Sequence, residues 1–449
     1  MIMPTKCKSC GVETNLEATF FKRHKSFSRT VQTYCPQCWL KQQQSDAKRG
    51  LWWNCSLGAL GIFLWIVWPE FSLGRVLVNL FVFQIFLILT ILPHELGHAW
   101  MARLLGMRVF KLYIGSGKTV FRKRLFGFDS EIKAVPMGGL VFACHRDLAY
   151  IRSKQIAFVL AGPAINLVLA AVISPFLNPD DLWSFKPFEQ ELQIGLLFFY
   201  ANLIVLLVNL WPRNVATGFG TFPSDGKQLF LTFFMSEEQR KLSHSASFVM
   251  EASIYYEQGD YLSAQSWVEK GLALYPGNET LLNWHGVVAL GLGDYGNARE
   301  CFLNLLQRES KEPLMRPLLM NNIAYANALL GGDELLKEAD EFSSEAMTAM
   351  SWMPAIRGTR GTVLAAMGRV AEALPLLHDS MLQAEIAGHK AQNACVIAEA
   401  EWRRGNLDAA RIYLEEARKL DPQCSLLIRV EKVIRSDPQM DTNSTMTTT

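Results

Sequence analysis

Two histidines and a glutamate near residue 95 carry the clearest chemistry in this sequence. His94 and His98 lie four residues apart, and Glu95 is next to the first of them. Side chains four apart share one face of a helix, so both imidazoles can bind the same metal ion. The adjacent carboxylate can accept a proton from a metal-activated water. The pattern ends an apolar stretch, where ionisable groups are costly and usually functional, and so it predicts a catalytic zinc site.

A catalytic zinc ion needs about three protein ligands and one open position, so a third ligand must come from elsewhere in the chain. Asp225, in the sequence Pro-Ser-Asp-Gly after the last apolar segment, is the best-placed carboxylate. An ordinary turn at Asp225-Gly226 is the alternative interpretation. Asp180 and Asp181 are poor candidates, because the charge pattern described below places them on the opposite side of a membrane.

Four of the nine cysteines form two Cys-x-x-Cys pairs, namely Cys7, Cys10, Cys35 and Cys38. Two such pairs in a chain with an odd number of cysteines favour one shared metal ion over disulfides, with a redox pair as the alternative. Four thiolates leave no position for water, so the predicted zinc ion is structural. We therefore predict a small zinc ribbon over residues 1–40 that depends on its metal for folding, followed by a short polar linker at 41–50.

The elements that position the histidines are apolar. Four stretches contain no Asp, Glu, Lys or Arg, at 51–68, 76–92, 155–177 and 192–211. Each is long enough, alone or with its flanks, to cross a hydrocarbon layer of about 30 Å. A buried soluble helix bundle is the alternative, but tryptophans at the edges fit membrane interfaces better. The sequence predicts a mainly α-helical, polytopic membrane core over 51–240 with about four spans, at 51–68, 73–102, 155–177 and 192–212.

The charges predict the orientation of these spans. The chain has 44 Lys and Arg against 42 Asp and Glu, and this near-neutral balance argues against a nucleic-acid partner. The loop 101–154 is strongly basic, whereas the loop 178–191 is mostly acidic. Because cytoplasmic loops carry the excess of Lys and Arg, we expect the basic loop and both termini to be cytoplasmic. The lipid bilayer is then a partner of an integral, multi-pass protein.

Beyond residue 240 the sequence becomes repetitive. Gly-Asp-Tyr at 259–261 recurs 34 residues later at 293–295, and Ala264 recurs as Ala298 at the same offset. This period, with small residues that let paired helices pack closely, resembles tetratricopeptide repeats. About five copies are expected over 245–431, with an ordinary helical bundle as the alternative. A cytoplasmic α-solenoid of this type implies a protein or peptide partner.

Four motifs occur in order along residues 73–230. They are the segment around His94 and Glu95, the Gly138-Gly139 loop, Ala161-Gly-Pro-Ala-Ile-Asn166, and Asn209-Leu-Trp-Pro212 followed by Asp225-Gly226. Together they resemble the motifs of the site-2 protease family of intramembrane zinc metalloproteases. One departure is that eleven residues, 213–223, separate the last proline motif from Ser224 and Asp225.

The resemblance implies a role for each motif. His94, His98 and Asp225 would hold zinc, and Glu95 would act as general base and then protonate the leaving nitrogen. Two asparagines of the apolar spans, Asn166 and Asn209, would stabilise the oxyanion or position the substrate, with interhelical hydrogen bonds as the alternative. The Gly138-Gly139 loop would offer a backbone edge to an extended substrate, unless it is a plain turn.

The predicted function is therefore hydrolysis of peptide bonds in membrane-spanning protein substrates, with one catalytic and one structural zinc ion. The alternative is a membrane-anchored adaptor with an inactive core, which recruits proteins through its repeats. The insertion at 213–223 keeps this alternative open, whereas a transport role is disfavoured because the spans hold no further carboxylates. The polar tail at 435–449 is predicted to be disordered.

Overall fold

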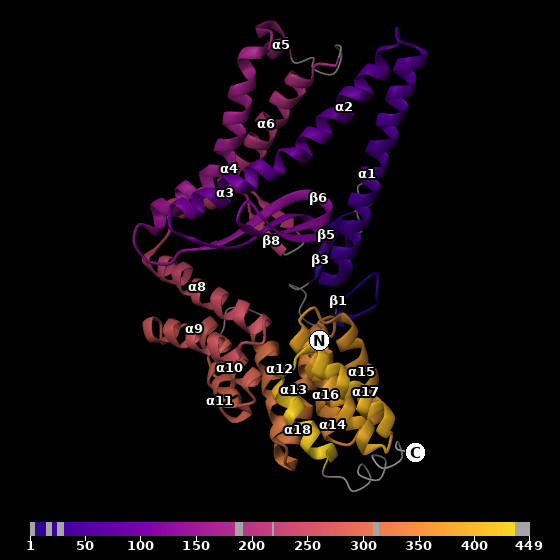
Figure 1. The fold of residues 1–449 in the computed structure, drawn as a ribbon, viewed down its shortest axis with the longest axis vertical. Helices are drawn as coiled ribbons and strands as arrows, with labels where there is room; N and C mark the ends of the chain where they lie inside the picture. The colour runs from indigo at the N-terminus through magenta and orange to yellow at the C-terminus, as the bar shows by residue number, and fades with distance from the viewer. Residues whose placement is uncertain are drawn as a thin grey trace, which may run out of the picture. The chain divides into compact units, whose positions relative to one another are not determined.

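A computed structural model describes residues 5–14, 20–24, 31–184, 192–217, 220–308 and 314–435. The structure is mostly helical, as the sequence predicts (Figure 1). The chain divides into two units. The membrane unit comprises Leu40–Ser247, and the repeat unit joins Met1–Trp39 to Phe248–Thr449.

The membrane unit is built on long apolar helices, α1 (Pro36–Val67), α2 (Ser72–Leu89), α3 (Ile91–Leu104), α4 (Ile151–Ile173) and α6 (Ile194–Leu210). Among the described residues, three helical stretches are long and apolar enough to cross a membrane, Pro36–Val67, Ser72–Leu104 and Ile151–Phe176. The second stretch contains α2 and α3, which are separated only by Thr90. The fourth expected span corresponds to α6, which is apolar but has only 17 residues.

The polar segment 41–50, predicted to be a short linker, is helical and forms part of α1, which begins at Pro36 and continues through the first apolar stretch. Polarity does not exclude a helix. Most residues here are good helix formers, and proline is absent. Side-chain contacts one turn apart support the helix, including an ion pair between Asp46 and Arg49 and a hydrogen bond from Gln42 to Asp46.

Glycines bring α1 and α2 into close contact. A Cβ added at Gly61 would lie 2.7 Å from the Cβ of Leu77, and one at Gly74 would lie 2.6 Å from the backbone nitrogen of Trp65. Helices in membranes associate through such small residues, because lipid provides no hydrophobic driving force between them. The additional first span therefore packs on the helix that leads to the histidines.

A long antiparallel hairpin follows α3, with β5 (Arg108–Leu125) paired to β6 (Phe128–Cys144). Leu112 of the hairpin packs in one buried cluster with Leu96 of α3 and Phe158 of α4. The remaining elements are η2 (Ser174–Phe176), α5 (Pro179–Ser184), the hairpin β7 (Asn214–Thr217) with β8 (Gly220–Pro223), α7 (Asp225–Phe233) and α8 (Glu237–Glu257). The core of the unit thus lies between α3, α4 and the long hairpin.

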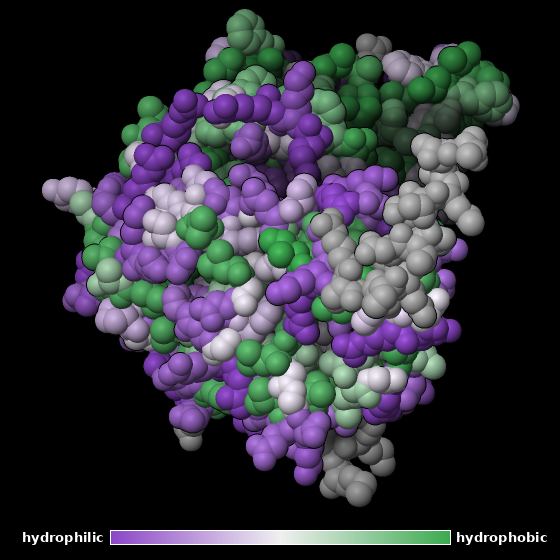
Figure 2. Space-filling view, turned by 60° about the horizontal axis from the view of Figure 1, so that its bottom comes forward, coloured by the Kyte–Doolittle hydropathy of each residue, from purple (hydrophilic) through white to green (hydrophobic). Residues whose placement is uncertain are grey.

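The repeat unit begins with two small hairpins, β1 (Thr5–Lys6) with β2 (Glu13–Thr14) and β3 (Phe21–His24) with β4 (Val31–Tyr34). Its helices are α9 (Tyr261–Leu274), α10 (Glu279–Leu292), α11 (Tyr295–Leu306), α12 (Met315–Leu330), α13 (Asp333–Met350), α14 (Pro354–Ala366), α15 (Val370–Gln383), α16 (Ala387–Arg403), α17 (Leu407–Leu420) and α18 (Ser425–Arg435). The face shown in Figure 2 is largely hydrophilic, with hydrophobic residues scattered over it.

The repeated Gly-Asp-Tyr tripeptide has a local structural reason. Gly259 and Gly293 end their helices with φ near +80°, a conformation that side chains disfavour. The following Asp260 and Asp294 cap the next helices by accepting hydrogen bonds from the backbone nitrogens three residues further on. The tripeptide therefore marks the turn within each helical hairpin. The predicted disordered tail lies outside the described residues from position 436 onward.

Candidate active site and metal centres

His94 and His98 lie on one face of α3, and both side chains are buried. Their Nε2 atoms are 3.2 Å apart. The Nδ1 atom of His98 donates to the carbonyl of Phe158 at 2.7 Å, and the Nδ1 atom of His94 lies 2.7 Å from Oδ1 of Asn166. Because both Nδ1 protons are used in these bonds, the two Nε2 lone pairs face each other, as in metal-binding histidines.

Asp225 joins the two histidines. Its Oδ2 lies 3.1 Å from Nε2 of His94, and its Oδ1 lies 3.6 Å from Nε2 of His98. Oδ2 is buried and has no hydrogen-bond donor among the residues that the structure describes. Tetrahedral zinc ligands with bonds of about 2.0–2.1 Å lie about 3.3 Å apart, so the three groups fit a zinc ion.

The inserted residues 213–223 do not displace Asp225. They form the β7–β8 hairpin, which pairs Asn214 with Pro223 and returns the chain close to its starting point. Ser224 closes the hairpin, since its backbone nitrogen donates to the carbonyl of Arg213 at 2.8 Å. Its hydroxyl donates to the carbonyl of Trp211 and caps the first turn of α7. The insertion therefore loops out and leaves Asp225 at the start of α7.

Glu95 is buried beside the histidines, and glycines make room around all three side chains. A Cβ at Gly139 of β6 would lie only 2.3 Å from Cγ of Glu95. A Cβ at Gly162 of α4 would lie 2.2 Å from Nε2 of His98. The backbone of the Gly138-Gly139 motif and that of the 161–166 motif on α4 therefore lie directly against the predicted site, with no side chain at Gly139 or Gly162 between them.

The structure treats the two predicted asparagines differently. Asn166 is buried and contacts His94, and its Nδ2 donates to Oδ1 of Asn202 at 3.0 Å. Asn209 is half-buried, and none of the described hydrogen bonds joins it to His94 or Glu95. Sequence reasoning missed Asn202. The sequence does contain an indication of Asn202, because it is the other asparagine of the same charge-free span. It lies about two helical turns from Asn209.

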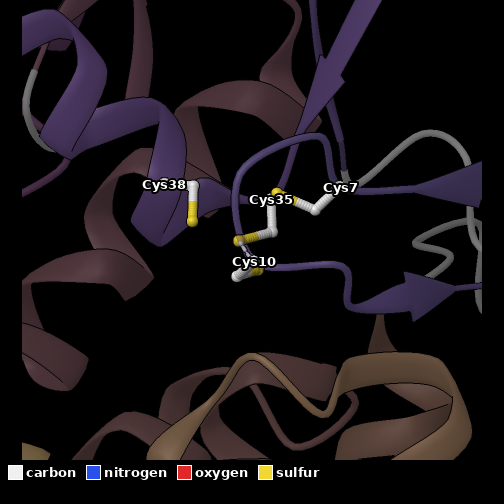
Figure 3. A group of neighbouring side chains, drawn as sticks. All are labelled: Cys7, Cys10, Cys35 and Cys38. Atoms are coloured by element: carbon white, nitrogen blue, oxygen red, sulfur yellow. Dashed lines mark hydrogen bonds between the residues drawn. The ribbon is translucent and has the colours of Figure 1, made fainter.

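The four paired cysteines also meet. Cys7 and Cys10 follow β1, Cys35 precedes α1, and Cys38 lies in the first turn of α1, with their sulfurs within 4.8 Å of one another (Figure 3). Burial would raise the pKa of Cys7, but backbone N–H groups, with that of Cys35 foremost, lower it to about 7. Burial raises the pKa of Cys10 and that of Cys35. Four cysteine sulfurs this close together nevertheless suit a structural zinc ion.

The cysteine module packs on the repeats. The hydroxyl of Thr14 donates to the carbonyl of Ala349 in α13 at 2.7 Å, in a buried position. Trp352, which follows α13, packs against the cluster that contains Cys7, Phe20 and Cys35. The cysteine module therefore belongs to the same unit as the repeats.

Comparison with known proteins identifies both parts of the chain. Residues 82–192 match peptidase family M50, and residues 352–423 match the tetratricopeptide repeat. The chain carries a peptidase family M50 domain. This domain contains the two histidines, Glu95 and Asn166, and the site-2 protease resemblance is thereby confirmed. The repeats are confirmed as well.

Several bacterial relatives resemble the M50 domain. Zinc metalloprotease Rip1 of Mycobacterium tuberculosis is 30% identical over 105 residues, which make up 20% of this chain and 26% of that protein. A putative zinc metalloprotease of Neisseria meningitidis is 33% identical over 106 residues, covering 21% and 23%. The regulator of sigma-E protease RseP of Salmonella typhimurium is 31% identical over 109 residues, covering 21% and 24%. The match thus spans about a quarter of each relative.

Solved structures resemble the other part of the chain. A thermophilic tetratricopeptide repeat protein from Thermus thermophilus is similar over 42% of this chain and 99% of its own, with 20% identity and a TM-score of 0.33. The repeat protein YrrB is similar over 44% and 95%, with 20% identity and a TM-score of 0.25.

Proposed function

We propose that this protein is an intramembrane zinc metalloprotease that cleaves membrane-spanning protein substrates. The observation that carries the proposal is the meeting of His94, His98 and Asp225 beside the buried carboxylate of Glu95, with both histidines and Glu95 inside the M50 match. Three ligands leave a fourth position open, which is the arrangement of catalytic rather than structural zinc sites.

The three ligands would hold zinc, and the bound ion would supply Lewis acidity toward a water molecule and the scissile carbonyl. Glu95 accepts the proton that water loses as its oxygen attacks the carbonyl carbon. The same carboxyl group then gives the proton to the amide nitrogen as the carbon–nitrogen bond breaks. The buried position of Glu95 keeps bulk water from competing for this proton.

Asn166 serves this reaction as a positioning residue. Its contact with Nδ1 of His94 holds the imidazole with Nε2 toward the metal, and Asn202 orients its amide in turn. Direct contact of Asn166 or Asn209 with the oxyanion remains a prediction.

The long hairpin supports a binding mode for the substrate. Helical carbonyls are already hydrogen-bonded, so a membrane-spanning helix must unwind before it can be cut. The backbone of β6 at Gly139 lies against Glu95, and the Gly138-Gly139 segment can pair with the unwound substrate as an additional strand. This pairing would place an extended peptide at the catalytic carboxylate.

The soluble modules complete the proposal. The basic loop 101–154 favours a cytoplasmic position for the hairpin, for both termini and hence for the repeats. The four-cysteine site would hold a structural zinc ion, and the repeats would recruit a protein partner or the substrate.

The test is cleavage in liposomes that contain the purified chain and a single-span protein with a helix-breaking residue in its span. We expect cleavage by the unaltered chain and none by Glu95→Gln, while both bind two zinc ions. The His94→Ala variant should bind one. An unaltered chain that binds one zinc ion and cleaves no single-span protein would refute the protease and favour the adaptor.

A further inference from the structure

The last helix that the structure describes, α18, and the turn before it contact much more than the adjacent repeat. In a solenoid each repeat normally contacts only its neighbours. Here the hydroxyl of Tyr261, at the start of α9, donates to Oδ2 of Asp421 at 3.2 Å, across 160 residues of sequence. A Cβ at Gly259 would lie 3.5 Å from the other carboxylate oxygen of Asp421. The turn before α18 thus contacts the first helical hairpin.

The contacts continue along α18 itself. Ser425 lies against the next turn, where a Cβ at Gly293 would approach its Cβ to 3.1 Å, and its side chain bonds to Tyr295. One turn further on, Nη1 of Arg429 donates to the carbonyl of Leu329 at the end of α12, at 2.6 Å. The turn and α18 therefore contact the α8–α9, α10–α11 and α12–α13 hairpins in succession.

Both faces of α18 fit this position. The buried face consists of Leu426, Leu427, Val430 and Ile434, which pack in one cluster with Leu329 and Cys395. Ile428, on the opposite face, is 72% exposed. Beside Arg429 there is a cavity of about 250 Å³, lined by residues of α12, α14 and α16 such as Ala328, Thr362 and Val396. The helix thus fills part of a groove between the repeats, and the groove continues past it.

We propose that α18 is an intramolecular ligand of the repeats, which exchanges with a partner helix of the same chemistry. The partner would be a basic amphipathic helix with apolar residues spaced as in α18 and an arginine that donates to the carbonyl of Leu329 at the end of α12. An eleven-residue helix is barely stable alone, so α18 depends on the groove for its stability and can leave it when a partner helix takes its place. This inference rests on the proposed protein-binding function of the repeats.

The test uses the full chain in detergent and a fluorescent peptide of residues 421–435. We expect the unaltered chain to bind the peptide weakly, because its own helix competes. The Val430→Asp chain, whose own helix is weakened, should bind it at least tenfold more tightly. The matched Ile428→Asp chain, changed on the exposed face, should behave like the unaltered chain. A peptide that carries Val430→Asp should not bind to any of the three.

Hydrogen exchange distinguishes a removable helix from a structural one. In the Val430→Asp chain, exchange should rise in α18 and remain unchanged in α12 and α14. The inference is wrong if exchange rises in all the repeat helices, or if the unaltered and Val430→Asp chains bind the peptide equally. Cleavage of a single-span protein is measured in parallel. If the Val430→Asp chain binds the peptide more tightly but the unaltered chain cleaves nothing, only the proposed protease activity is refuted. If cleavage occurs but peptide binding does not change, only the proposed role of α18 is refuted.

Discussion

Replacing Ser224 by alanine tests how Asp225, the proposed third zinc ligand, is held in place. The hydroxyl of Ser224 accepts hydrogen bonds from the backbone nitrogens of Arg213 and Lys227, at 3.1 and 3.4 Å, and donates to the carbonyl of Trp211 at 2.7 Å. These three bonds join the end of α6, the base of the inserted hairpin and the first turn of α7. Asp225 is the next residue, so its position depends on all three.

The size of the effect follows from these bonds. Loss of an N-cap costs about 1 kcal/mol, and each of the other two bonds contributes about 0.5–1.5 kcal/mol. The free energy that favours the ordered turn over its disordered alternatives would fall by about 2–4 kcal/mol. Because about 1.4 kcal/mol corresponds to a factor of ten, zinc affinity at the catalytic site should fall by about 30-fold, and by at most about 700-fold.

The assay is competition between the full chain in detergent and a chelator of known zinc affinity. The unaltered chain should release zinc in two steps, and Ser224→Ala should shift only the step that His94→Ala removes. The four-cysteine site then serves as an internal reference. Ser236→Ala is the matched control, because Ser236 accepts from the backbone nitrogen of Gln239 and caps α8 in the same way. Unchanged affinity in Ser224→Ala would show that the hairpin holds Asp225 without its hydroxyl.

Three further variants test the surroundings of the two metal sites. Gly139→Ala should abolish cleavage but keep both zinc ions, because its Cβ would displace the side chain of Glu95 and leave the ligands alone; loss of zinc from this variant would contradict that geometry. Gly162→Ala should remove the catalytic zinc, since its Cβ would occupy the space of Nε2 of His98, and metal analysis measures this. Cys35→Ser should remove the other zinc ion and lower the melting temperature of the repeats, which pack on the cysteine module; an unchanged melting temperature in a calorimeter would mean that this contact contributes no stability.

Much of the candidate site could be predicted from short-range spacing. The pairing of His94 with His98 needs only a helix, and the cysteine pairs need only a tight turn, so both are visible in the sequence. The repeat period is equally local, because Gly259 and Asp260 end one helix and begin the next whatever lies around them. The length of α1 is less visible, since the polarity of 41–50 says nothing about how far the helix continues.

Contacts between distant segments decided the rest. Whether Asp225 reaches the histidines depends on the inserted hairpin closing on itself, and the hydrogen bonds of Ser224 that close it cannot be read from the sequence. Asn202 rather than Asn209 contacts Asn166 because helix packing selects one of two turns of the same span. The sequence by itself determined the ligand types, the apolar spans and the repeats, since these depend on neighbours along the chain. Only the tertiary structure decided which carboxylate meets the histidines, which residue contacts His94 and where α18 packs, because each depends on residues brought together from different helices.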